Sequence, residues 1–301
     1  MLIGALEAGG TKMVCAVGTE DGKIIDRISF LTGNQEETIQ KIIQYFLKWK
    51  IEALGIGCFG PVDLNKNSKT YGFIMNTPKK GWSYCNVAGR FAGILKVPVG
   101  FDTDVNGAVL GEVTYGVAKG LNSAIYITVG TGIGVGVYIN GALLHGLAHP
   151  EAGHILISRD RNDKYQGCCR FHTDCAESLA SGSAILGRYG IPADKLSNRE
   201  EVWNMEGYYL GQAITNYILS YSPEKVILWG GVMHQKQLLQ IVREQVVKQL
   251  NGYITNEMLI DRIDDYIVEP ALGDNAGIAG AIKLGIDALY AGRHETEYFC
   301  C

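Results

Sequence analysis

Residues with metal-ligand chemistry gather in one short stretch of the chain. Cys169, His172 and Cys175 are separated by regular two-residue gaps, and His154 lies upstream of them. Thiolate and imidazole are the ligands that zinc takes in closed tetrahedral sites, which leave no position for a reactive water. The spacing therefore predicts a structural zinc held by His154, Cys169, His172 and Cys175, with Cys168 as an alternative to His154. The competing interpretation is a set of reduced thiols and surface imidazoles.

Two glycine-rich turns could wrap phosphate oxygens. Each lies between two apolar runs: Gly9-Gly10-Thr11-Lys12 near the start of the sequence, and Gly130-Thr131-Gly132 further on. The later turn fits neither a Rossmann fingerprint, which needs a helix after the glycines, nor a P-loop, which ends in Gly-Lys-Ser/Thr. One remaining interpretation is a hairpin turn whose backbone N–H groups and threonine hydroxyl bind phosphate. The other is a tight hairpin turn in which the glycines are needed only for steric reasons.

A pair of carboxylates follows a predicted strand. Residues 97–101 are apolar, Asp102, Thr103 and Asp104 follow, and residues 105–116 are predicted to be helical. Ligands bind at strand ends in open α/β sheets. Asp104, at or just before the helix N-terminus, is therefore a candidate general base, metal ligand or helix cap.

Two further carboxylates, Glu151 and Glu177, flank the predicted zinc ligands. They are placed to accept hydrogen bonds from sugar hydroxyls if the metal shapes a pocket wall, and the alternative is solvated surface charge. His149, Glu151 and His154 do not form the metalloprotease HExxH pattern.

The hydrophobic pattern predicts a scaffold of alternating strands and helices for these residues. The two strand–turn–strand units lie about one domain apart, which indicates an internally duplicated α/β architecture with two similar lobes. The other predicted elements are a helix at 34–50, strands at 54–59, 225–229 and 266–269, helices at 235–250 and 276–291, and a frayed tail at 292–301.

Composition limits the class of protein. The chain has 301 residues, of which 47% are hydrophobic, and a net charge of −4, so it lacks the basic field that favours nucleic-acid binding. The sequence shows no signal peptide and no apolar run approaching about 20 residues. We therefore expect a cytoplasmic enzyme that binds neither nucleic acid nor membrane, with its eight cysteines reduced.

The order of the motifs resembles a known family. EAGGTK, GPVD, TDVNGA, VGTGIGVG, HPEAGHI, CxxHxxCxExxxSG, SPEKVILWGGV and ALGDNAGIAGA resemble those of the ROK (repressor, open reading frame, kinase) sugar kinases, most closely the bacterial ROK fructokinases, from residue 3 to about 285. The resemblance implies the actin-like ATPase fold, two RNase H-like lobes around a central cleft. The implied division is an N-terminal lobe of residues 1–116 with a C-terminal helix at about 283–301, and a C-terminal lobe of residues 117–282 with a zinc-binding insertion at 149–182.

The resemblance also implies roles for individual residues. Asp104 would be the catalytic base, and His154, Cys169, His172 and Cys175 would hold zinc. Sugar would contact Gly60, Thr103, Asp104, Glu151, His154 and Glu177. ATP, with Mg²⁺, would contact Gly9, Gly10, Thr11, Lys12, Gly130, Thr131, Gly132, Pro223, Gly230, Gly231, Ala271, Leu272, Gly273, Asp274 and Asn275.

Two departures from the family pattern bear on the substrate. Glu7 stands where many members have Asp, and the fructokinase-like members share this Glu. Thr103 stands where glucokinase-like members have Asn. Thr is shorter than Asn and lacks its paired donor and acceptor, which favours a sugar other than glucose.

The resulting expectation is a homodimeric, ATP-dependent fructokinase that makes fructose 6-phosphate. A mannokinase or a broad-specificity hexose kinase is the alternative within the same class. A sugar-binding non-catalytic protein is disfavoured by Asp104 and both turns. A repressor-type ROK protein needs an N-terminal helix-turn-helix, for which this sequence leaves no room before the first hairpin.

Overall fold

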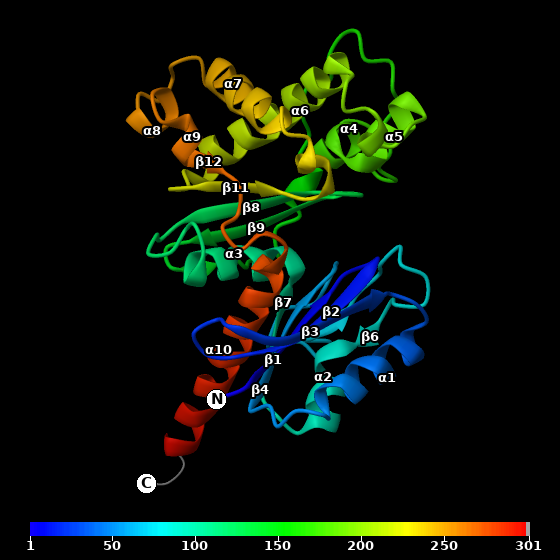
Figure 1. The fold of residues 1–301 in the computed structure, drawn as a ribbon, viewed down its shortest axis with the longest axis vertical. Helices are drawn as coiled ribbons and strands as arrows, with labels where there is room; N and C mark the ends of the chain where they lie inside the picture. Colours follow the sequence, from blue (N-terminus) through cyan, green and yellow to red (C-terminus); the bar gives the residue numbers. More distant parts are fainter. Residues whose placement is uncertain (299–301) are drawn as a thin grey trace. The chain divides into compact units, whose positions relative to one another are not determined.

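The computed structural model describes residues 1–298, with side chains described through residue 291. The chain forms two compact units (Figure 1). Unit 1 contains residues 1–120, 143–150 and the segment from 271 onward, and unit 2 contains residues 121–142 and 151–270. The division expected from the sequence, 1–116 with 283–301 against 117–282, differs from these units at residues 117–120, 143–150 and 271–282. Residues 276–282 belong to unit 1 because they begin the long helix α10 (Ala276–Tyr298), which packs on the first sheet.

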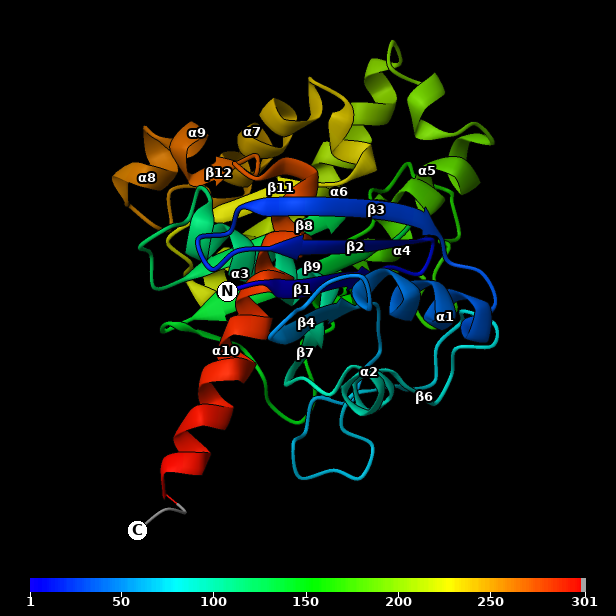
Figure 2. The same ribbon diagram turned by 60° about the horizontal axis from the view of Figure 1, so that its bottom comes forward.

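Each unit contains a five-stranded sheet, and the two sheets share one topology. The first has the order β3-β2-β1-β4-β7, visible in Figure 2, and the second has the order β10-β9-β8-β11-β12. In both sheets an antiparallel hairpin is followed by strands parallel to its first strand. The strands are β1 (Ile3–Ala8), β2 (Lys12–Gly18), β3 (Ile24–Leu31), β4 (Ala53–Cys58), β7 (Val99–Thr103), β8 (Ala124–Val129), β9 (Ile133–Ile139), β10 (Ala142–Leu143), β11 (Val226–Trp229) and β12 (Ile267–Val268). The predicted internal duplication is confirmed.

In unit 1, helices cover both faces of the sheet. Alternate side chains of a strand point to opposite faces, so Leu6 packs with α1 (Gln35–Phe46) and α2 (Val87–Leu95) while Ala5 packs with α10. Asn34 caps α1, because its side chain accepts hydrogen bonds from the backbone N–H groups of Glu36 and Glu37. Helix α10 approaches the sheet so closely that a Cβ on Gly55 would lie 1.7 Å from the carbonyl oxygen of Ala281.

Unit 2 places helices α6 (Glu200–Tyr221) and α7 (Leu238–Leu250) side by side on one side of its sheet (Figure 1). Its other helices are α4 (Ala176–Ala180), α5 (Gly182–Tyr189), α8 (Glu257–Ile260) and α9 (Ile263–Tyr266), with 3-10 turns η1 (Ala152–His154), η2 (Ala193–Lys195) and η3 (Gly231–His234). Unit 1 also contains α3 (Asp104–Tyr115), the short pair β5 (Phe73–Ile74) and β6 (Cys85–Asn86), and the 3-10 turn η4 (Gly273–Asn275). Among the described residues, no helix is long and apolar enough to cross a membrane.

Several element boundaries differ from the predicted ones. Helix α7 begins at Leu238 rather than 235, because the chain first forms η3 and then an extended residue at Gln235. Strand β7 continues to Thr103, beyond the predicted end at 101. The backbone of α10 is helical to Tyr298, where a frayed tail was predicted from 292, and residues 299–301 lie outside the described part of the chain.

Candidate functional site

The corner between β7 and α3 carries the predicted catalytic carboxylate. Thr103 is extended and caps α3: its Oγ1 accepts a hydrogen bond of 3.1 Å from the backbone N–H of Asn106. Asp104 is the first residue of the helix, and its Oδ1 accepts from the N–H of Val105 at 2.9 Å. The helix-cap interpretation of Asp104 was therefore wrong, because the strand runs two residues further than predicted, to Thr103, and Thr103 takes the capping position.

Asp102 is a buried anchor of the same corner. Only 3% of the residue is exposed. Its Oδ1 accepts hydrogen bonds from the N–H of Thr103 (2.8 Å) and from Nδ2 of Asn106 (2.7 Å), and its Oδ2 accepts from Nε2 of His145 (2.8 Å). Sequence reasoning missed His145, since nothing in the spacing links it to β7.

Acidic and basic groups from several elements of unit 1 act electrostatically on Glu7. Burial, and next the negative charge of Asp104, raise the pKa of Glu7 to about 7. Asp274 acts in the same direction, while Lys12 and Arg27 act to lower that pKa. The structure thus brings the predicted residues Lys12, Asp104 and Asp274 into one electrostatic environment around Glu7 at the end of β1.

The first glycine-rich turn connects β1 to β2 as predicted. The N–H of Gly9 donates to the carbonyl oxygen of Lys12 at 3.0 Å. The carbonyl oxygens of Gly9 and Thr11 accept from Thr32, at 2.7 and 2.9 Å. Apart from its chain neighbours, no heavy atom of the described residues lies within 4 Å of where a Cβ would be on Gly10, so this part of the turn is open.

Two other predicted segments of unit 1 follow strands or precede a helix. Gly60 follows β4, and its carbonyl oxygen accepts a hydrogen bond from Oγ1 of Thr77. Ala271 and Leu272 donate their N–H groups to the fully buried carboxylate of Glu112 on α3, at 3.2 and 2.9 Å. Sequence reasoning missed Glu112, although a lone carboxylate within an apolar helix was a usable signal. Gly273, Asp274 and Asn275 then form η4, directly before α10.

The second glycine-rich turn connects β8 to β9 in unit 2. The N–H of Gly130 donates to the carbonyl oxygen of Gly132 at 2.9 Å, and the start of α5 donates to the carbonyl oxygens of Gly130 and Thr131 from Gly182 and Ser183. A Cβ on Gly132 would lie 2.3 Å from Oε2 of Glu177, so a larger residue at this position would displace the Glu177 side chain.

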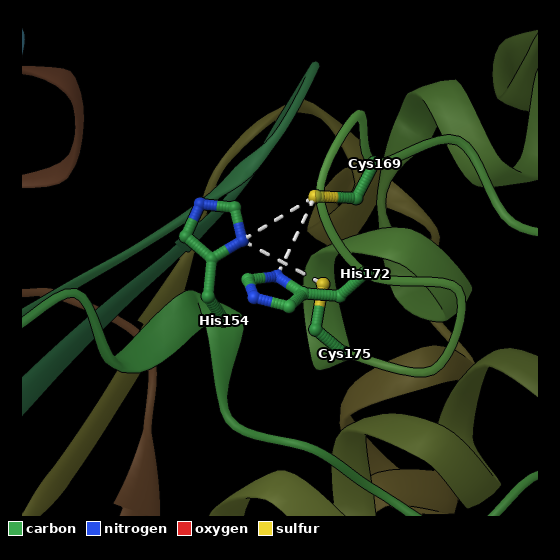
Figure 3. A group of neighbouring side chains, drawn as sticks. All are labelled: His154, Cys169, His172 and Cys175. Atoms are coloured by element: carbon green, nitrogen blue, oxygen red, sulfur yellow. Dashed lines mark hydrogen bonds between the residues drawn. The ribbon is translucent and has the colours of Figure 1, made fainter.

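The four predicted zinc ligands converge (Figure 3). Nδ1 of His154 lies 3.7 Å from Sγ of Cys169 and 3.6 Å from Sγ of Cys175, and Nδ1 of His172 lies 3.8 Å from Sγ of Cys169. Zn–S and Zn–N bond lengths around a tetrahedral zinc give N···S edges of about 3.6 Å. The ligand set therefore fits zinc in both donor type and geometry. Cys168, the alternative ligand, instead faces Ser181 and the backbone of α4.

The predicted sugar-binding residues of unit 2 lie beside this cluster. Because Nδ1 of His154 faces the sulfurs, its Nε2 points elsewhere and lies 3.9 Å from Oε1 of Glu177. The other carboxylate oxygen of Glu177 accepts from the N–H of Ile133 at 3.0 Å, which ties the zinc region to the second glycine-rich turn. Glu151 is exposed and precedes η1, where its carbonyl oxygen accepts from the N–H of His154.

The predicted nucleotide residues around β11 do not all come together. Gly230 and Gly231 follow the carboxyl end of β11, and Gly230 has a φ of 109° that favours glycine. Pro223 precedes the opposite end of this strand, where its carbonyl oxygen accepts from the hydroxyl of Tyr266. Pro223 and the pair Gly230–Gly231 therefore lie at opposite ends of β11, roughly 20 Å apart along the chain.

A duplicated five-stranded sheet with a glycine–threonine hairpin in each copy defines the actin-like ATPase fold. The family model described as "ROK family" matches residues 3–288, and this chain belongs to that family. It is 54% identical over 290 residues to a putative fructokinase of Bacillus subtilis, covering 96% of this chain and 97% of the relative. It is 40% identical over 289 residues to a fructokinase of Pediococcus pentosaceus, covering 96% and 99%.

A solved structure of a ROK family glucokinase from Streptomyces griseus in complex with glucose and AMPPNP superimposes with a TM-score of 0.73. The match covers 95% of this chain and 100% of that chain at 22% sequence identity, and it supports the fold.

Proposed function

We propose that this chain is an ATP-dependent fructokinase, which transfers the γ-phosphoryl group of ATP to the primary hydroxyl of D-fructose and gives fructose 6-phosphate and ADP. The observation that carries the proposal is Asp104, fixed at a strand end in a unit that also holds a glycine–threonine phosphate turn, in a chain whose relatives at 54% and 40% identity are named fructokinases. The solved ROK family glucokinase with bound glucose and AMPPNP supports a hexose and ATP as the two substrates.

In the proposed reaction, Asp104 is the general base. Its carboxylate accepts the proton of the attacking hydroxyl while the new O–P bond forms and the bond to the departing ADP breaks. The hairpin turns Gly9–Lys12 and Gly130–Gly132 supply backbone N–H groups and hydroxyls to phosphate oxygens. We assign Gly230, Gly231 and Ala271–Asn275 to nucleotide contacts and leave Pro223 out.

Magnesium would enter with ATP and neutralise charge on the transferred phosphoryl group. Carboxylate oxygens are its preferred ligands, and unit 1 offers Glu7 together with Asp104 and Asp274, which share one electrostatic environment. Binding of the cation would lower the pKa of Glu7 again, because a positive charge favours the ionised carboxylate.

We further propose that zinc occupies the cluster of His154, Cys169, His172 and Cys175 as a structural ion. With zinc on Nδ1, the Nε2 of His154 carries the proton and can donate to a sugar hydroxyl or to Glu177. We assign the proposed sugar contacts to the side chains of Thr103, Glu151, His154 and Glu177 and to the backbone of Gly60.

A coupled ADP-release assay tests this function. We expect the highest kcat/KM with fructose among fructose, mannose, glucose and N-acetylglucosamine. Equal values for fructose and mannose would favour the broad hexose kinase instead, and no ADP release with any sugar would favour the non-catalytic sugar-binding protein. A homodimer and a cytoplasmic location remain predictions, to be checked by sedimentation and by cell fractionation.

A further inference from the structure

Residues 143–150 belong to unit 1, although the chain on both sides of them belongs to unit 2. Two histidines attach this segment. Nε2 of His145 lies 2.8 Å from Oδ2 of Asp102, and Nε2 of His149 accepts from the N–H of Val62 at 3.3 Å. An ionised carboxylate only accepts hydrogen bonds, so the His145 nitrogen is the donor.

The partner of His145 organises the catalytic corner. Both hydrogen bonds to Oδ1 of Asp102 come from that corner, one from the backbone of Thr103 and one from the side chain of Asn106. The remaining oxygen, Oδ2, is the one that accepts from His145. One buried carboxylate thus joins the end of β7, the first turn of α3 and the segment 143–150.

We propose that His145 is a positioning residue for phosphoryl transfer: it holds Asp102, and through Asp102 the corner from which Asp104 projects. The inference rests on the proposed kinase function. The same contact fixes the segment that leads along the chain to Glu151 and the zinc ligand His154.

Removal of the His145 imidazole should leave a buried carboxylate oxygen of Asp102 without its hydrogen-bond donor. A buried carboxylate needs a full set of partners, and without His145 the Oδ2 of Asp102 loses the only donor that the described residues give it. The corner would then relax toward another arrangement. Small displacements of a catalytic group reduce turnover strongly, because the reaction depends on near-attack geometry.

The charge state of His145 gives the contact a pH dependence. The hydrogen bond to Asp102 raises the pKa of His145, whereas partial burial and the nearby Lys66 act to lower it. His145 and Asp63 both line an open pocket of about 480 Å³, and burial, followed by the charge of Asp102, raises the pKa of Tyr71. Below its pKa the imidazolium makes a charge-assisted hydrogen bond. Above it the neutral ring still donates, but more weakly.

Three variants of the full chain test the inference. His145→Ala removes the donor, His145→Gln keeps a neutral donor, and Leu147→Ala changes a fully exposed side chain of the same segment as the control. At pH 6 we expect kcat with fructose to fall about tenfold for Ala and less for Gln, with the KM for ATP within about twofold of wild type. The advantage of wild type over Gln should shrink between pH 6 and pH 9, because wild type loses its charge there and Gln does not.

A role in stability alone would predict another pattern, with lower melting temperatures and no pH-dependent difference in kcat. That pattern, or an Ala variant with wild-type kcat, overturns the inference while leaving the fructokinase proposal intact. Wild-type protein that releases no ADP with any sugar overturns the proposed function and this inference with it. A second experiment does not depend on turnover. NMR titration should give a lower pKa for His145 in the Asp102→Asn variant than in wild type, and an unchanged pKa contradicts the proposed contact.

Discussion

At the scale of single residues, the structure separates two roles that the sequence left together at Asp104. Thr103 supplies the cap of α3. Asp104 is held at the start of the same helix but is not its capping residue. Asp104→Asn should therefore lower kcat by roughly 10²–10⁴-fold, since the amide cannot accept the proton, while the melting temperature stays near that of wild type. Steady-state kinetics and thermal melts on the same sample check both parts.

The matched control for this substitution is Thr103→Val, which keeps the side-chain shape but removes the cap. It should lower the free energy of unfolding by about 1 kcal/mol. If Asp104→Asn instead destabilised the protein as much as Thr103→Val and kept more than about a tenth of the turnover, Asp104 would be a structural residue.

Thr103 also carries the prediction on sugar selection. Thr103→Asn keeps a capping side chain, so stability should change little, and it adds an amide with both a donor and an acceptor. We expect the ratio of kcat/KM for glucose over fructose to rise by an amount equivalent to about 1–3 kcal/mol. Measured ratios that equal those of wild type would place the selection at other residues.

At the scale of elements, we predict that the segment around the Cys/His cluster depends on a bound metal for its shape. The residues between η1 and α4 contain little regular structure, and the ligands come from η1, the following loop and the residue that caps α4. Cys175→Ser should abolish stoichiometric zinc and lower the free energy of unfolding by several kcal/mol, because metal binding and local folding are coupled. Serine still caps a helix, so the loss reports on the metal.

Cys168→Ser is the control for that experiment. Cys168 neighbours a ligand in the sequence but faces Ser181 and backbone carbonyls, so this variant should keep one zinc per chain and most of its stability. Metal analysis by mass spectrometry and thermal melts decide the question. Wild-type protein that contains no zinc when purified without chelator contradicts the assignment.

The elements also show where sequence reasoning succeeds. Ligands at regular short spacing could be predicted, because Cys169, His172 and Cys175 lie on one loop. The contact from Glu177 to the second glycine-rich turn could not, since it joins residues 44 apart. The same limit applies to Glu112 and to His145, whose partners lie on distant segments.

At the scale of the whole molecule, duplication was predictable because each copy of the hairpin carries its own local pattern of apolar runs and glycines. The boundaries of the two units were harder to predict. Residues 143–150 and 271–282 each follow a stretch of unit 2 in the sequence, but both segments pack in unit 1. They are held there by contacts with Asp102 and Glu112 and by close glycine contacts along α10. Such contacts depend on the folded arrangement and leave no periodic signal in the chain.

The stability of the molecule should depend on pH through Glu206 on α6. Burial raises the pKa of Glu206 from 4.5 to about 8, and within the described residues neither carboxyl oxygen has a hydrogen-bond partner. A carboxyl with a raised pKa binds more protons in the folded than in the unfolded state between these values. The contribution of Glu206 to the free energy of unfolding is therefore fully present below pH 4.5 and is lost as pH rises toward 8.

Glu206→Gln keeps the size of the side chain and removes its ionisation. The variant should match wild type near pH 4.5 and become more stable than wild type as pH rises, by roughly 1–4 kcal/mol at pH 8. Denaturant unfolding of both proteins at several pH values measures the difference. Glu200→Gln, an exposed substitution on the same helix, should leave the pH profile of wild type unchanged. A Glu206→Gln profile parallel to that of wild type would mean that Glu206 ionises as easily in the folded chain as in the unfolded one.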